Sequence, residues 1–204
     1  QIDTGQAADM FKRMGDILKR NLLKEKAKSS YAQAALLFDD TASLESDEAL
    51  SYAWRGWAFV CRGYIDPRRG HFRTAHMYFL KASDISHDEV IKRYRKSNAL
   101  FYLSLANVFE EERLHHALNL IEESLRVLPT NLSTESSNIR RACLIVLNAI
   151  VNEEKRTHNI YELRTLLSSR VKYCRGLIRL LDHLIKGEEH FTRPLLLDIF
   201  QALC

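Results

Sequence analysis

The stretch from Ser51 to Ser86 constrains the fold most, because its pattern is that of two helices folded back on each other. In both halves, small and aromatic residues recur at helical spacing, so they share one face and let two helix backbones approach closely. Helix-stopping residues lie between the halves, and Gly63 is predicted to be a left-handed carboxy-terminal cap. The residues of the two faces are Trp54, Trp57, Ala58 and Cys61, then Phe72, Ala75, Phe79, Leu80 and Ala82.

The rest of the chain has the same helical character. Seven glycines and three prolines are few for 204 residues, and they favour long uninterrupted helices. No stretch shows the sustained alternation of apolar and polar residues that is typical of a strand. We therefore predict an all-α fold in which antiparallel helical hairpins stack as a short solenoid, followed by a carboxy-terminal helical bundle.

The spacing of apolar residues also predicts the individual helices outside this hairpin. Ser46 is the expected N-cap of the helix that begins near Asp47, and Ser86 to Glu89 matches a capping box. Gly187 is expected to cap the end of a long helix that is either continuous or joined from two near Ser168. The predicted helices cover residues 7–28, 31–44, 86–110 (with a break near 97–98 as the alternative), 114–128, 139–152, 160–186 and 192–204.

One segment is polar and rich in Ser and Thr, namely residues 130–138, and it is the best candidate for an internal boundary. We expect repeat-like helical hairpins over residues 7–129. The carboxy-terminal helices, over residues 139–204, are expected to pack on these hairpins as one continuous domain.

A short pattern of small and large apolar residues occurs three times, at intervals of about forty residues. A second pattern, aromatic-x2-apolar-small-x2-apolar, precedes its second and third copies. The copies of the first pattern are Ala34-x3-Phe38-x2-Thr41, Ala75-x3-Phe79-x2-Ala82 and Ala117-x3-Ile121-x2-Ser124. The preceding helices carry Trp54-x2-Trp57-Ala58-x2-Cys61 and Tyr102-x2-Leu105-Ala106-x2-Phe109.

Over residues 30–130 this arrangement resembles the tetratricopeptide repeat, in which such a helix pair closes on a proline, here Pro129. The chain departs from that family in its longer period and in having Ala58 and Ala106 where glycine is usual. Residues 117–181 resemble more faintly the helical-repeat arm of PCI-type scaffold subunits. The predicted structural core comprises Trp54, Trp57, Ala75, Phe79, Ala82, Phe109, Ala117 and Ile121.

Motifs that would carry a reaction are missing from the sequence. No His has a Cys or a second His at the spacing of a helical metal site, and no glycine-rich phosphate loop or activated nucleophile is visible. The paired glutamates are expected to be solvated helix ends. The chain is therefore not expected to be an enzyme, and we expect no cofactor, metal ion or small-molecule substrate.

The same inspection predicts an intracellular protein, cytoplasmic or nuclear. The longest apolar run, residues 143–151, is far shorter than a membrane span, and no signal peptide is visible at the amino terminus. The four scattered cysteines are expected to be buried thiols in a reducing compartment. The net charge of +4 permits an acidic partner without demanding one.

Three basic groups are the candidate partner-binding residues. Arginine beside aromatic rings suits protein interfaces and acidic peptides, and it also stacks on bases. We therefore expect a non-enzymatic helical scaffold that mediates protein–protein interaction or self-association as a subunit of a larger complex. The alternative is an RNA- or DNA-binding helical domain. The groups are Arg62, Arg68, Arg69 and Arg73; Lys92, Arg93, Arg95 and Lys96; and Lys172, Arg175, Arg179 and Lys186.

Overall fold

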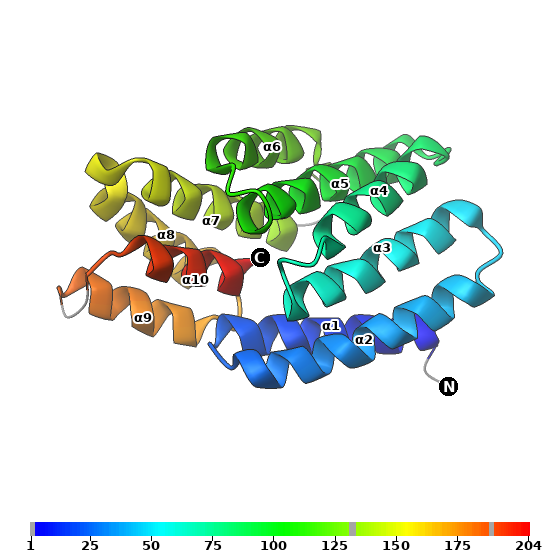
Figure 1. Cartoon of the computed structure of the whole chain (residues 1–204), viewed down its shortest axis with the longest axis horizontal. Helices are drawn as coiled ribbons and strands as arrows, with labels where there is room; N and C mark the ends of the chain where they lie inside the picture. Colours follow the sequence, from blue (N-terminus) through cyan, green and yellow to red (C-terminus); the bar gives the residue numbers. More distant parts are fainter. Residues whose placement is uncertain (1–2, 131–133, 188–189) are drawn as a thin grey trace. The chain divides into compact units, whose positions relative to one another are not determined.

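The computed structural model describes residues 3–130, 134–187 and 190–204, and these residues form ten α-helices and one short 3-10 helix without a β-strand. Consecutive helices pack on each other as hairpins, so the predicted all-α fold is confirmed (Figure 1). The elements are α1 (Thr4–Arg20), α2 (Lys24–Leu44), α3 (Glu48–Ile65), α4 (His71–Asp84), α5 (Glu89–Phe109), α6 (Leu114–Val127), α7 (Thr134–Val151), η1 (Glu153–Lys155), α8 (Arg156–Arg170), α9 (Arg175–Ile185) and α10 (Arg193–Leu203).

The helices divide into two compact units. The first unit comprises residues 1–16 and 25–132, and the second comprises residues 17–24 and 133–204. The division after residue 132 falls inside the polar segment that the sequence marks as a boundary, of which residues 131–133 lie outside the described part. That the carboxy-terminal helices pack on the hairpins stays a prediction.

The first unit is a series of helical hairpins. Helix α3 packs on α4, α4 on α5 and α5 on α6 (Figure 1). Ring contacts join α2 to α3, with centroids 4.9 Å apart for Tyr31 and Tyr64 and 5.6 Å apart for Phe38 and Trp54. The recurring pattern lies on α2, α4 and α6, and all of its residues except Thr41 are buried: Ala34, Phe38, Ala75, Phe79, Ala82, Ala117, Ile121 and Ser124.

Tyr102 of α5 lies at the centre of the aromatic core in this unit. Its ring contacts Phe79 and Phe72 of α4 at centroid distances of 5.6 Å and 6.2 Å, and Trp57 of α3 at 6.0 Å. Stacked and edge-to-face rings of this kind fill space between helices and add a favourable term beyond area burial. Three successive helices are therefore fixed against one another through one side chain.

Gly63 does not cap a helix, contrary to the prediction. Helix α3 continues past it to Ile65, and a Cβ atom built at Gly63 would lie 2.5 Å from the ring of Phe72. The glycine is required because the α4 ring sits directly against the α3 backbone. Gly187, by contrast, has a φ of +77°, as expected of a left-handed cap.

Several predicted helix boundaries are wrong. The first helix ends at Arg20 rather than at residue 28, because Leu22 adopts a φ of 64° and turns the chain. Ser29 and Ser30 lie inside α2, where the Ser30 hydroxyl donates to the Lys26 carbonyl at 3.5 Å. The N-caps of α3 and α5 are Asp47 and Asp88 rather than Ser46 and Ser86.

In the second unit, α7 packs on α8, α8 on α9 and α10 on α7. Helix α7 begins at Thr134, five residues before its predicted start. The predicted segment 160–186 is two helices, since residues 171–174 separate α8 from α9. Thr192 caps α10 through its hydroxyl, as the sequence predicts for a helix that starts at this point. All four cysteines of the chain are buried thiols, also as predicted.

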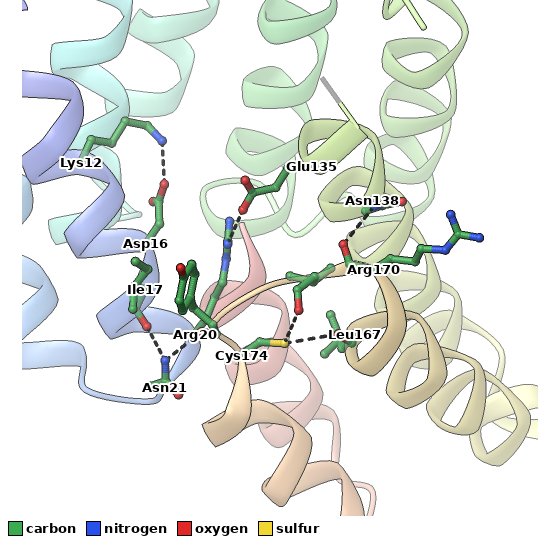
Figure 2. A network of polar contacts seen from close by, with 12 residues as sticks. Lys12, Asp16, Ile17, Arg20, Asn21, Glu135, Asn138, Leu167, Arg170 and Cys174 are labelled. Atoms are coloured by element: carbon green, nitrogen blue, oxygen red, sulfur yellow. Dashed lines mark hydrogen bonds and ion pairs between the residues drawn. The ribbon is translucent and has the colours of Figure 1, made fainter. Parts of the chain in front are cut away.

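Asn21 anchors residues 17–24 within the second unit (Figure 2). Its side-chain amide donates to the carbonyl groups of Ile17 and Tyr173, each at 2.8 Å, and its Oδ1 accepts from the Gly176 amide at 3.0 Å. Nearby, Arg20 pairs with Glu135 at 2.8 Å. A Cβ at Gly176 would lie 2.7 Å from the Asn21 Cα, so this close approach needs glycine.

Candidate interaction surfaces

The first predicted basic group does not form one patch. Arg62 pairs with Asp39 of α2, whereas Arg73 contacts Glu110 and Glu111 beyond the end of α5. Arg68 and Arg69 are exposed in the loop between α3 and α4, and Arg69 pairs with Asp66 at 2.8 Å. Three of the four arginines are thus paired with carboxylates, Arg62 and Arg73 with residues distant in the sequence and Arg69 with Asp66 of its own loop.

In the second predicted basic group, one residue makes hydrogen bonds within the fold and the others are at least partly exposed to solvent. Arg95 donates to the Ala82 carbonyl at 3.2 Å and to the Ser86 hydroxyl at 2.6 Å, so it caps the end of α4. Arg93 and Lys96 are exposed on α5, and Lys92 is half-buried. Arg95 is therefore committed to the fold.

The third group, in the second unit, is the most accessible one. Arg175 and Arg179 lie one turn apart on α9, and both are exposed. Lys172 precedes this helix and Lys186 follows its last residue, so both lie outside the predicted helical stripe. No ion pair with another described residue involves Lys172, Arg175 or Arg179.

The predicted structural core is only partly sealed from solvent. Trp54, Trp57 and Phe109 are half-buried, and Lys12 lies over the Trp57 ring at 5.0 Å. Phe109 contacts the Phe72 ring at 6.2 Å. Five of the predicted core residues are buried, namely Ala75, Phe79, Ala82, Ala117 and Ile121.

A candidate surface that the sequence analysis missed lies where α4 meets α5. Five large apolar side chains between residues 77 and 91 are exposed; we call them the apolar corner. One of them, Leu80, was predicted on the inner face of the hairpin, and that prediction is wrong. A lone exposed apolar residue is ordinary, but several near one helix junction make it a candidate surface for protein contact. Their exposed fractions are 54% for Met77, 38% for Leu80, 40% for Ile85, 39% for Val90 and 43% for Ile91.

The apolar corner is held rigidly by internal hydrogen bonds. The Ser83 hydroxyl donates to the Lys92 carbonyl at 3.0 Å, which joins the two helices. The Asp88 carboxylate accepts from the amides of Val90 and Ile91 at 2.8 Å and 2.9 Å and so fixes the start of α5. A pre-organised surface loses little conformational entropy on binding. Val90 and Ile91 lie in the first turn of α5, where too few helical residues precede them for the spacing of apolar residues to identify a face.

The described residues hold no group of three His, Cys, Asp or Glu side chains arranged to bind a metal ion. Among the histidines, His76 is half-buried and its Nδ1 lies 2.9 Å from the Ala99 carbonyl. Burial lowers the pKa of His76 from its ordinary value. In the described part of the chain, no helix has the length and apolar character needed to cross a bilayer.

Comparison of the chain with protein-family models, with curated proteins and with solved structures gave no match.

Proposed function

We propose that the chain is a non-enzymatic helical scaffold that mediates protein–protein interaction or self-association as a subunit of a larger complex. The observation that supports this most is the apolar corner, with its five exposed large apolar side chains on a hydrogen-bonded helix junction. Covering such side chains with protein removes apolar surface from water. Because these side chains are only 38–54% exposed, each contributes at most about half of the roughly 1.5–3 kcal/mol of full burial. The serial hairpins supply a rigid support for the surface.

The experiment combines sedimentation velocity with site-specific photo-crosslinking. A photoreactive phenylalanine analogue replaces Met77, and crosslinks are mapped in the purified chain and in cells. We expect either a species heavier than the 23.7 kDa monomer or one discrete crosslinked protein. Leu80→Glu combined with Ile91→Glu should abolish that species, because a charge cannot be buried without cost.

Leu36→Glu combined with Leu44→Glu is the matched control, because both leucines are exposed on α2, a helix that contributes no residue to the apolar corner. This control should leave the crosslink and the mass unchanged. A monomer at every concentration, together with no discrete crosslink in cells, would contradict the proposal.

A second candidate function is nucleic-acid binding through α9. It is favoured by the exposure of Arg175 and Arg179 and by the lack of any ion pair between them and another described residue. Such binding would weaken steeply with salt concentration, because each neutralised phosphate releases counterions. Arg175→Glu with Arg179→Glu should abolish binding of RNA or DNA oligonucleotides in a filter assay, and an unchanged affinity would rule this function out.

A further inference from the structure

A ladder of four half-buried rings crosses from α3 to α4, and of the predicted partner-binding residues Arg62 lies against it. The Tyr78 ring contacts Tyr52 at a centroid distance of 6.1 Å and Phe59 at 5.6 Å, and Phe59 contacts His71 at 6.0 Å. Tyr52 and Phe59 lie two turns apart on α3, as do His71 and Tyr78 on α4, so each helix contributes one row. We call these four rings the aromatic ladder.

Cations lie against both ends of the aromatic ladder. The Arg62 guanidinium lies 5.0 Å from the Phe59 centroid, and the Lys81 ammonium lies 5.7 Å from the Tyr52 centroid. Arg55 lies on the same face of α3, three residues after Tyr52, and it is exposed. The Arg62 guanidinium is already paired with Asp39, so the exposed Arg55 and Lys81 are the cations beside the ladder that can pair with an anion.

The balance of charge around the ladder is positive. Asp39 is committed to Arg62 and Asp66 to Arg69. The Glu48 carboxylate accepts a hydrogen bond from the Tyr52 hydroxyl and raises the pKa of that phenol. The exposed cations Arg55, Arg68 and Lys81 form no ion pair with another described residue. The Glu48 carboxylate keeps its negative charge, but these three cations outnumber it, so the excess charge around the ladder attracts an anion.

The arrangement of the rings favours a peptide over a nucleic acid as the ligand. Phe59 and Tyr78 are stacked on each other with an interplanar angle of 19°, while Arg62 and Lys81 lie over the rings of Phe59 and Tyr52. Bases bind such platforms through free ring faces, which the stacking and the two cations occupy here. Ring edges remain, and they offer apolar contact and a positive rim to carboxylates and aliphatic side chains.

From this geometry we propose that the aromatic ladder and its flanking cations bind an acidic linear segment of a partner protein. The inference rests on the proposed scaffold function and names the chemistry of one partner. The α3 row from Tyr52 to Arg62 spans about 15 Å at the helical rise. An extended segment of about five residues covers that length. Acidic side chains of the segment would meet Arg55 and Lys81, and the apolar residues between them would contact the ring edges.

The test measures fluorescence anisotropy of the purified chain with a labelled eight-residue peptide in which glutamate alternates with leucine. We expect saturable binding that weakens with salt, and a peptide with glutamine at every glutamate position should bind at least about tenfold more weakly. Arg55→Glu combined with Lys81→Glu should weaken binding of the acidic peptide by about tenfold or more. Both residues are exposed, and circular dichroism verifies that the double variant stays folded.

Lys26→Glu combined with Arg126→Glu is the matched control, since it makes the same change in net charge at exposed sites on α2 and α6. It should alter the affinity by less than about twofold. The proposal is overturned if the peptide does not bind at millimolar concentration or if the control weakens binding as much as the test variant. Equal competition by an octamer of uridine would assign the face to nucleic acid instead. Loss of self-association at the apolar corner leaves this assay unaffected, so the two proposals fail separately.

Discussion

Among single residues, Lys12 of α1 is the most thoroughly enclosed cation of the first unit. Its ammonium lies 2.9 Å from Asp16 and 5.0 Å from the Trp57 ring, and Asp16 also accepts from the Tyr31 hydroxyl at 2.7 Å. Burial is the largest single effect on the pKa of Lys12 and acts to lower it, but Asp16 together with Tyr102 and Cys61 raises the pKa above its ordinary value. The ion pair is therefore part of the packing between α1, α2 and α3.

Lys12→Met should lower the free energy of unfolding by about 3 kcal/mol, because the Asp16 carboxylate stays enclosed without its cation. Arg13→Met is the control, since Arg13 pairs with Asp9 at 2.7 Å on the exposed side of the same helix. That pair should contribute less than about 1 kcal/mol. Urea denaturation followed by circular dichroism measures both, and equal losses would contradict the role given to Lys12.

A second residue-scale prediction concerns Glu110, whose side chain is 13% exposed. Burial raises its pKa above the ordinary value of 4.5, and Arg73, 3.6 Å away, only partly offsets that effect. The folded state therefore binds this proton more tightly than the unfolded state. The stability from Glu110 is complete below pH 4.5 and is lost as pH rises through the higher folded-state pKa.

Glu110→Gln removes this titration, so wild type should lose stability relative to the variant as pH rises from about 4 to about 7. Chemical denaturation at several pH values measures the difference. Glu122→Gln, at an exposed position on α6, controls for the loss of one surface charge. A stability difference between wild type and Glu110→Gln that does not change with pH would show that burial does not govern this carboxylate.

At the scale of the helix, close approach decides where glycine is needed. Alanine at Gly63 would improve helix propensity by about 1 kcal/mol, but its Cβ would press against the buried Phe72 ring. Overpacking usually costs about 1–3 kcal/mol, so Gly63→Ala should destabilise the fold. At Gly5 the nearest atom is 3.4 Å away, and Gly5→Ala should be neutral or stabilising. Thermal unfolding measures the stability of both variants. A Gly63→Ala variant more stable than wild type would show that the Phe72 ring can move to accommodate the added methyl group.

The sequence predicts the inner faces of the helices better than their ends. The inner positions of α2, α4 and α6 follow from periodicity, because Ala34, Ala75 and Ala117 recur with the same neighbours. The turn after α1 contains neither glycine nor proline, and Leu22 carries its positive φ. The contacts that support this turn come from Tyr173 and Gly176, more than 150 residues away in the sequence, so no local signal predicts it.

The candidate surfaces were harder to predict than the fold, because each depends on partners from other helices. Arg62 and Arg73 belong to one basic group in the sequence, yet Arg62 pairs with Asp39 of α2 and Arg73 with Glu111 after α5. The aromatic ladder was missed because Tyr52, Phe59 and Tyr78 are not part of the core pattern. Only the packing of α3 on α4 brings these rings together.

At the scale of the whole molecule, the helices of each unit pack against their neighbours within that unit. We propose that apolar side chains left exposed serve for docking, and the apolar corner is the clearest example. If the chain is a scaffold, another protein should cover the apolar corner in the complex that forms in cells. The solvent exposure of the apolar corner, rather than the stability of the fold, is therefore the property to measure.

Hydroxyl-radical footprinting with mass spectrometry measures coverage residue by residue. The oxidation rate of Met77 is compared between the dilute purified chain and the native complex isolated from cells, with the exposed Leu44 as internal control. The account predicts that Met77 becomes protected in the complex while Leu44 stays equally reactive in both samples. Equal oxidation of Met77 in the two samples would contradict it.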